Sequence, residues 1–184
     1  MYKFRVIYPV CVVFALCFAA CENNMETVKM VTAPDKTPLL VEADAIVEYK
    51  DSGKTRFKLV ATQLESYGGN DPYYVCPKSF TIDFYDDSMN VKSHVSADYG
   101  IRHEKTKLME ADNNVVVVNR KGDQLNTEQL FWDAGKHIIY TSKYVQIKTA
   151  TEILFGDGLQ SNEDFSNYKI TNIKGTVVLD NSKK

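Results

Sequence analysis

The chain is poor in the residues that most often carry out chemistry. Of its 184 residues, only four are cysteine and three are histidine. His94, His103 and His137 fall on separate predicted strands or turns, and no HExxH or CxxC motif accompanies them. A GxSxG nucleophile elbow and a phosphate-binding loop are also missing. We therefore expect a protein that is not an enzyme and that uses neither a cofactor nor a metal ion.

Disulfide bonds are not expected in the folded part. Cys11 and Cys17 lie inside an N-terminal signal, so only Cys21 and Cys76 remain after its removal. Cys76 follows Tyr-Tyr-Val and precedes a proline, a context in which a small core or loop residue is the ordinary explanation. A reactive thiol is the less favoured alternative, and a hydrolase built on Cys76, His94 or Asp157 is the least favoured function.

Long uncharged runs are missing except at the N-terminus. There, the basic residues Lys3 and Arg5 precede an uncharged run from residue 6 to residue 20, which is the pattern of a secretory signal. The run ends in Phe18-Ala-Ala-Cys21, and small residues before a cysteine are typical of signals that are cut ahead of a lipid-modified cysteine. We predict that residues 1–20 are a lipoprotein signal peptide and that Cys21 is acylated.

An uncleaved membrane helix is the alternative for this run. About fifteen residues at about 1.5 Å each reach only about 22 Å, whereas the hydrocarbon core of a bilayer is about 30 Å thick. Pro9 would also interrupt such a helix. Cleavage before Cys21 is therefore favoured.

An excess of positive charge is also missing. The formal net charge is −2, and loss of Lys3 and Arg5 with the signal lowers it to about −4. This balance argues against nucleic acid as a partner. A weakly acidic domain on a lipid anchor is expected to face an aqueous compartment outside the cytoplasm, most simply the periplasm.

Polar and apolar residues alternate with the period of a β-strand through most of the chain. Residues 21–37 carry scattered charge with no sustained period, and we assign them to the acylated N-terminus and a flexible tether. The folded domain is expected to span residues 38–184. Within it, two alternating segments flank Asp51-Ser-Gly53, which predicts a hairpin. Further strands are predicted at residues 80–84, 91–99, 107–111, 114–119, 124–133, 136–142 and 144–148.

The strand pattern recurs at a spacing of about thirty residues, which is in the range of repeated supersecondary units. Ala97, Leu108, Met109, Val115 and Val117 recur as Thr127, Ile138, Ile139, Val145 and Ile147. Helical periodicity is missing from the domain, apart from a single turn near residues 127–130. Gly156-Asp-Gly158 is predicted to be a turn with positive φ, and ion binding by Asp157 and Asp164 is the less favoured alternative.

A sheet with one apolar face must bury it in a sandwich or a barrel, and the order of the units favours a single elongated, rolled sheet. The residues predicted to point inward are Val47, Phe57, Phe80, Ile82, Val95, Leu108, Val117, Leu130, Ile138 and Ile147. Trp132 should share a face with Leu130. Tyr49, Tyr99 and Tyr140 would suit the mouth of a cavity for an amphipathic ligand, and they would equally suit a closed core.

The last third of the chain resembles the LptC family, the membrane-anchored periplasmic component of the lipopolysaccharide export machinery. The resemblance rests on four stretches taken together. They are Asp123-Gln-Leu-Asn-Thr-Glu-Gln-Leu-Phe-Trp-Asp133, Ile139-Tyr-Thr-Ser-Lys-Tyr-Val-Gln-Ile147, Gly156-Asp-Gly-Leu159 and Ile170-Thr-Asn-Ile-Lys-Gly175. The resemblance extends over most of residues 38–179.

The resemblance implies an all-β fold, a twisted, open β-jellyroll of antiparallel units like that of the periplasmic bridge protein LptA. Its apolar interior would carry the acyl chains of lipopolysaccharide, and Tyr49 and Trp132 would join the ten inward residues in lining this groove. Members of the family receive lipopolysaccharide from the inner-membrane ABC transporter and pass it to a bridge protein of similar fold. A structural or adhesive lipoprotein with a closed β-sandwich core is the alternative function.

The resemblance also implies docking sites. The segment Leu39–Lys50, with Ala45 at its centre, would face the transporter, and the last strand, with Thr176, Val177 and Val178, would pair with the bridge protein. The docking glycine of the family best matches Gly156, with Gly158 as the other candidate. Many members keep an uncleaved transmembrane helix, whereas this chain is expected to be anchored to the inner membrane by the acyl group on Cys21.

Overall fold

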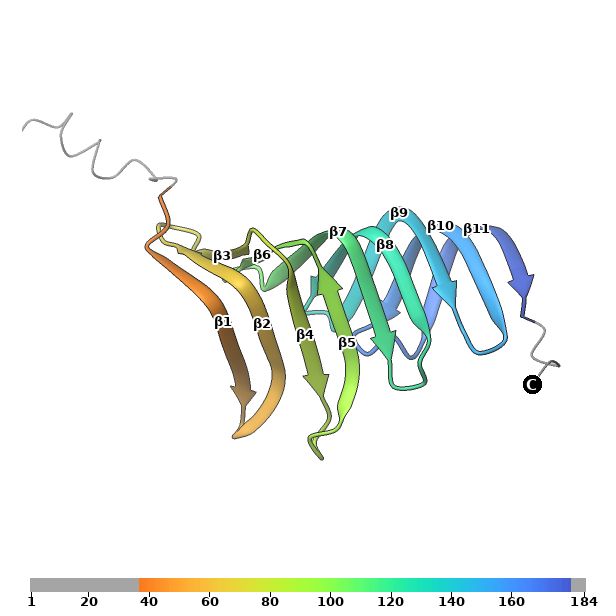
Figure 1. The fold of residues 1–184 in the computed structure, drawn as a ribbon, viewed down its shortest axis with the longest axis horizontal. Coiled ribbons are helices and arrows are strands. Elements are labelled where there is room, and N and C mark those ends of the chain that lie inside the picture. The colour runs from red at the N-terminus through yellow and green to blue at the C-terminus, as the bar shows by residue number, and fades with distance from the viewer. Residues whose placement is uncertain (1–36, 180–184) are drawn as a thin grey trace, which may run out of the picture. The chain divides into compact units, whose positions relative to one another are not determined.

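The computed structural model describes residues 37–179, and every regular element in that range is a β-strand. Eleven strands join into one antiparallel sheet, in which β1 and β11 each have a single neighbour (Figure 1). The strands are β1 (Leu40–Asp51), β2 (Lys54–Tyr67), β3 (Tyr73–Cys76), β4 (Phe80–Tyr85), β5 (Val91–Ala97), β6 (Tyr99–His103), β7 (Leu108–Asn119), β8 (Gln124–Asp133), β9 (Ile138–Lys148), β10 (Glu152–Asn162) and β11 (Tyr168–Val178). The predicted all-β, jellyroll-like fold is confirmed.

The predicted N-terminal features lie outside the described residues. These features are the signal peptide at residues 1–20, the acylated Cys21 and almost all of the tether. Within residues 37–179, no helix has the length and apolar character needed to cross a membrane.

β2 and β7 divide the sheet into two branches, because each pairs with two different strands along one edge. β2 pairs with β4 over Phe57–Ala61 and with β3 over Glu65–Tyr67, while β1 occupies its other edge. β7 pairs with β6 over Met109–Asp112 and with β5 over Val116–Asn119, while β8 occupies its other edge. Since β4 pairs with β5 and β3 pairs with β6, the branches are β4–β5 and β3–β6. Side chains from both branches face a common interior.

The long strands bend at β-bulges that lie next to one another in neighbouring strands. The register of β7 shifts between Asp112 and Val115, and that of β10 shifts at Gly158. The value of φ there is 64° at Asn113, 53° at Asn114 and 75° at Gly158. Asn and Gly tolerate this conformation better than other residues do. Because a bulge bends its strand, the row of bulges folds the sheet and turns its apolar face inward.

Two buried threonines satisfy backbone groups at this bend. The Thr127 hydroxyl donates a hydrogen bond to the carbonyl of Tyr144 at 2.9 Å, and the Thr141 hydroxyl accepts one from the backbone N–H of Lys143 at 3.0 Å. Ladder pairing is interrupted at a bulge, so backbone groups there need side-chain partners. The bend therefore places polar side chains inside an otherwise apolar core.

The bulges explain why several strands look interrupted in the sequence. The segments predicted at residues 107–111 and 114–119 form the single strand β7, and those at 136–142 and 144–148 form β9. The turn expected near residues 127–130 is the bulged part of β8. Gly156-Asp-Gly158 lies within β10, so the predicted turn is wrong, although the predicted positive φ is confirmed at Gly158.

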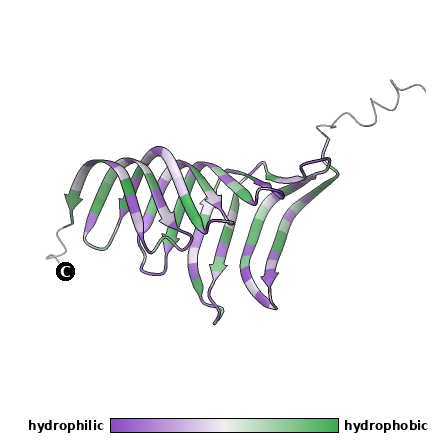
Figure 2. Ribbon diagram, turned by 180° about the vertical axis from the view of Figure 1, so that it is seen from behind, coloured by the Kyte–Doolittle hydropathy of each residue, from purple (hydrophilic) through white to green (hydrophobic). Residues whose placement is uncertain are grey.

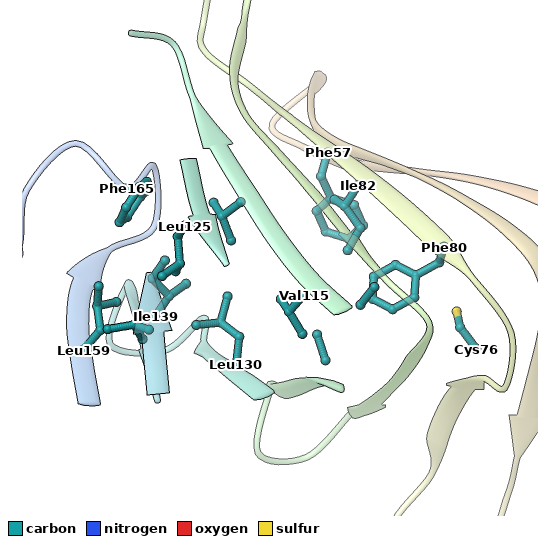
Figure 3. Packing of buried hydrophobic residues seen from close by; sticks show 14 of the residues in the cluster. Phe57, Cys76, Phe80, Ile82, Val115, Leu125, Leu130, Ile139, Leu159 and Phe165 are labelled. Carbon is teal, nitrogen blue, oxygen red and sulfur yellow. The ribbon is translucent and has the colours of Figure 1, made fainter. Parts of the chain in front are cut away.

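The thirty-residue repeat is visible in the burial of the core. Val115 and its counterpart Val145 are fully buried, and Val117 and its counterpart Ile147 are at most 1% exposed. Buried side chains from successive strands pack into one core (Figure 3). Hydrophobic and hydrophilic residues alternate along the strands, as a sheet with one buried face requires (Figure 2). The repeated unit is therefore a pair of bent strands.

Two residues expected in the interior point the other way. Met109 packs against the core and Ile139 belongs to it. Successive side chains in a strand point to opposite faces, so the adjacent residues Leu108 and Ile138 point outward. The inward orientation predicted for these two residues is wrong, because the sequence has two adjacent apolar residues at each place and alternation does not tell which of them is inside.

The loop between β10 and β11, residues 163–167, folds back into the sheet. Phe165 has φ of 53°, is fully buried and stacks on Tyr168 with ring centroids 5.0 Å apart. The amide of Asn119 donates a hydrogen bond to the Phe165 carbonyl at 3.0 Å. Phe165 therefore fills the interior at this place, where it lies near Leu125 and Leu159 (Figure 3).

Glu163, in the same loop, contacts two side chains of the β8–β9 hairpin, and we call these contacts the Glu163 latch. Its Oε1 accepts a hydrogen bond from Trp132 Nε1 at 2.9 Å and lies 3.1 Å from His137 Nδ1. These contacts hold the loop beside Trp132 and His137, which line the same cavity as Glu163.

The first prediction concerns Gly156. A Cβ added there would clash with Ile170 Cγ2 and would lie 2.6 Å from the carbonyl oxygen of Asn172. We expect Gly156→Ala to lower the free energy of unfolding by about 1 to 3 kcal/mol, because a neighbouring strand must move. Gly175→Ala is the matched control in the paired strand, since its Cβ would meet only Phe155 at 4.0 Å. Equal denaturant midpoints for the two variants would contradict the expectation.

The second prediction concerns the Glu163 latch. We expect Glu163→Ala to speed amide hydrogen exchange in residues 163–167 and to lower the free energy of unfolding by about 1 to 2 kcal/mol, because Trp132 loses a charge-assisted partner. Trp132 is the only tryptophan of the chain, so its emission reports the same change. Glu128→Ala, an exposed glutamate of β8, is the control. Exchange in the loop that matches the control would rule the latch out.

Candidate functional site

An apolar cavity lies between the two branches of the sheet, and we call it the apolar chamber. Its volume is about 330 Å³, within the range of about 300 to 1,000 Å³ that is usual for small-molecule sites. β1, β2, β3, β4, β6 and β7 all contribute to its walls. The lining residues are Val47, Tyr49, Phe57, Leu59, Leu64, Tyr74, Cys76, Phe80, Ile82, Gly100, Ile101, Arg102, Glu104 and Met109.

A second, more polar cavity of about 440 Å³ adjoins the chamber, and we call it the basic mouth. It shares Tyr49, Phe57, Arg102 and Met109 with the chamber, so the two spaces lie on either side of these side chains. The lining residues are Tyr49, Asp51, Arg56, Phe57, Phe84, Tyr85, Lys92, Ser93, Arg102, Lys107, Met109, Trp132, Ala134, His137 and Glu163.

Aromatic side chains cross the interior where the chamber meets the mouth. The Arg102 guanidinium lies 5.9 Å from the centre of the Tyr49 ring, a cation–π contact between β6 and β1. Tyr49 stacks on Phe57 at 5.1 Å, and Phe57 meets Trp132 edge-on at 6.0 Å. Edge-to-face and offset arrangements of this kind stabilise aromatic clusters. The border between the two spaces is therefore built from aromatic rings in contact with one another and with the Arg102 guanidinium.

Most of the residues predicted to line a groove do meet around this interior. Val47, Tyr49, Phe57, Phe80 and Ile82 line the apolar chamber. Val95, Val117, Leu130 and Trp132 surround a narrow gap of about 30 Å³ beside it, which confirms that Trp132 and Leu130 share a face. Whether lipid touches any of them stays a prediction.

Three predicted groove residues lie elsewhere. Ile147 is fully buried in the core between β8 and β10 and lines neither the chamber nor the mouth. Leu108 and Ile138 point outward. Of the three tyrosines considered for a cavity mouth, Tyr49 lines one, whereas Tyr140 stacks on Phe131 at 5.3 Å and Tyr99 lines neither space.

Sequence reasoning missed several lining residues. Leu59 alternates with Phe57, so the strand period was sufficient to find it. Met109 lines the chamber, whereas the sequence pattern assigns the inward position to its neighbour Leu108. Arg102 and Lys107 gave no signal, because charged residues on a strand or turn ordinarily face solvent. Only the rolling of the sheet brings both of them to the basic mouth, and Arg102 to the apolar chamber as well.

Cys76 lies in the chamber wall and does not have the properties of a nucleophile. It is 7% exposed, and burial raises its pKa to about 11. A reactive cysteine requires the opposite shift, because the thiolate is the nucleophile. The position of Cys76 therefore fits a small apolar lining residue.

The carboxylates considered as ion ligands are engaged with protein groups. Asp157 lies 2.6 Å from Lys174 Nζ, and Asp164 accepts a hydrogen bond from the backbone N–H of Ser166 at 3.0 Å. Within residues 37–179, no three His, Cys, Asp or Glu side chains gather where they could hold a metal ion.

The candidate docking residues fall into two groups. Thr176, Val177 and Val178 lie in β11, whose outer edge has no partner strand among residues 37–179, and Val178 is 78% exposed. Ala45 is in the other edge strand, β1, but its side chain is fully buried.

Gly156 and Gly158 are not at an edge. Both lie in β10, which is paired with β9 on one side and β11 on the other. Gly156 is explained by the close approach of Ile170 and of the Asn172 carbonyl, and Gly158 by its positive φ. Both glycines therefore have a structural role in the sheet, and the docking role expected of them stays a prediction.

Comparison with known proteins agrees with this architecture. The family model described as lipopolysaccharide-assembly, LptC-related, matches residues 10–177, which includes all strands from β1 to β10 and nearly all of β11. A search of curated proteins found no match. The match to the family model extends over most of the chain, and the protein belongs to the LptC family of lipopolysaccharide-assembly proteins.

Proposed function

We propose that this protein accepts lipopolysaccharide from the inner-membrane ABC transporter and passes it to a like-folded periplasmic bridge protein, without catalysing a reaction. Membership of the LptC family supports a role in lipopolysaccharide transport. The observation that carries the finer proposal is an apolar chamber inside a sheet whose two end strands each have an outer edge without a partner among residues 37–179. On this proposal, the acyl group on Cys21 anchors the protein to the inner membrane, and the tether holds the domain in the periplasm.

The chamber suits acyl chains because its walls are mainly apolar and come from several strands. Phe80 and Ile82 are at most 4% exposed, and they form its floor together with the half-buried Leu59 and Leu64. Transfer of apolar surface from water contributes about 25 cal/mol per Å². An acyl chain in the chamber is therefore stabilised without any specific polar contact, as a carrier that must also release its cargo requires.

The two free edges suit partners that add a strand. Within the described part of the chain, β1 and β11 each present one row of backbone N–H and C=O groups without a partner strand. Exposed apolar residues gather on the same strands, among them Leu40 and Ile46 on β1 and Val178 on β11. Long, apolar edges of this kind are rare in isolated domains, because they promote association with other strands. We propose that β1 faces the transporter and that β11 pairs with the bridge protein.

A photo-crosslinking amino acid placed in pairs of adjacent residues tests the lipid path. Val47 and Met109 line the chamber, whereas their neighbours Ile46 and Leu108 point outward. In cells that make lipopolysaccharide, we expect capture of the lipid at Val47 and Met109 at least about tenfold above that at Ile46 and Leu108, because an acyl chain in the chamber cannot reach the outer face. Equal capture within each pair would refute the path and favour a structural or adhesive lipoprotein.

A second crosslinking experiment tests the edge of β11. We expect a crosslinker at Val178 to capture the bridge protein, because an added strand would lie against β11. Lys148 of β9 is the control, since it is exposed but lies on a strand that is paired on both sides. Capture at Lys148 equal to that at Val178 would exclude strand addition at this edge. Co-purification with the membrane subunits of the transporter checks the β1 side independently.

A further inference from the structure

The basic mouth collects positive charge on a chain whose net charge is negative. Four basic side chains line it, Arg56, Lys92, Arg102 and Lys107, against the two carboxylates of Asp51 and Glu163. The chain as a whole carries a formal charge of −2. The mouth is therefore a local cationic site at the entrance to an apolar cavity.

The carboxylates near the mouth leave part of this charge available. Arg56 is held by Asp87 at 2.9 Å and lies 3.7 Å from Asp51, and Glu163 is engaged by Trp132 and His137.

Arg102 has one long ion pair, 3.6 Å from its Nε to Glu104, besides its contact with the Tyr49 ring. Lys107 makes no ion pair with any residue in the described range 37–179, and its φ of 55° fixes the turn that places it at the mouth. Lys92 likewise makes no ion pair within the described residues, so Arg102, Lys92 and Lys107 are the cations of the mouth with unused hydrogen-bonding capacity.

Ser93 supplies a second, independent observation. Its side chain is 1% exposed and belongs to the wall of the mouth. Its Oγ has no hydrogen-bond partner within the part of the chain that the structure describes, and it is the one buried side-chain oxygen or nitrogen there of which this is true. A buried hydroxyl without a partner costs about 1 to 3 kcal/mol, so a water molecule, an ion or a ligand is expected beside it.

We infer that the basic mouth is a phosphate-binding subsite for the headgroup of an amphiphile whose acyl chains occupy the apolar chamber. The inference rests on the proposed function and adds the chemistry that orients the lipid. The guanidinium of Arg102 matches two phosphate oxygens, Lys107 adds a point charge, and the Ser93 hydroxyl adds a neutral donor. Because Arg102 and Tyr49 line both spaces, one molecule can place its phosphate in the mouth and its chains in the chamber.

The test uses the full chain in nanodiscs of zwitterionic lipid, with Trp132 emission as the readout of binding. The probes are lipopolysaccharide, the same lipopolysaccharide after enzymatic removal of its phosphates, and inorganic pyrophosphate as a headgroup without chains. We expect the unmodified protein to bind the phosphorylated lipid about tenfold or more tightly than the dephosphorylated lipid, because a charge-assisted pair is lost with the phosphate. This preference should fall as salt is raised.

Matched variants assign the preference to the mouth. We expect Arg102→Gln with Lys107→Gln to bind both lipids equally, and Lys107→Gln alone to lose part of the preference. Lys105→Gln with Lys148→Gln removes the same charge at exposed positions outside the mouth and should keep the full preference. The single Lys107 variant keeps the test valid if the double variant does not fold, because Lys107 is an exposed turn residue.

Three results would overturn the inference, and they are distinguishable. Equal affinity of the unmodified protein for both lipids, with capture at Val47 intact, refutes the phosphate subsite and leaves the proposed function standing. Pyrophosphate that binds as tightly as the phosphorylated lipid reassigns the mouth to free phosphate. If neither lipid binds and Val47 captures none, the proposed function itself fails.

Discussion

The row of bulges across the long strands is the constraint on which the rest of the structure depends. A flat sheet of eleven strands would leave one whole apolar face in water. Bending each long strand near its middle turns that face onto itself, so Val115, Val145 and Leu159 from successive strands meet in one core. The residues that make the bend are small or polar, namely Asn113, Asn114 and Gly158, because only such residues hold positive φ at low cost. Because the bend interrupts the ladder, Thr127 and Thr141 lie inside the core, where their hydroxyls bond to the backbone groups of Tyr144 and Lys143.

The same bend has different results in the two halves of the sheet. From β7 to β11, each strand pairs with the next along most of its length, and Phe165 fills the remaining space, so that half is closed. From β1 to β6, the short strands β3 to β6 form separate branches, and their side chains do not meet fully. The chamber therefore forms where short strands lie next to long ones. Its apolar lining residues resemble a core, but no second layer of side chains packs against them.

Much of this architecture could be predicted from the sequence. Alternation gave most of the strands and the hairpin at Asp51-Ser-Gly53, although not β3, β6 or β10. The thirty-residue spacing gave the repeat, and the stretches around Trp132 and Gly175 gave the family. The bulges could not be placed, because an extra residue breaks alternation in the same way as a turn does, and two strands were divided as a result. The orientation predicted for Leu108 and Ile138 is wrong for a related reason. The cationic mouth had no sequence signal, because Arg56, Arg102 and Lys107 come from separate segments and meet only when the sheet rolls.

The division of the sheet at β2 and β7 determines how the interior can change in size. No strand pairing joins the β4–β5 branch to the β3–β6 branch within residues 37–179, so the two are connected through β2, β7 and the segments between them. Since each branch is hydrogen-bonded to β2 at one end and to β7 at the other, the separation of the branches is set by the bends of these two long strands. The width of the interior and the curvature of β2 and β7 are therefore one property of the sheet.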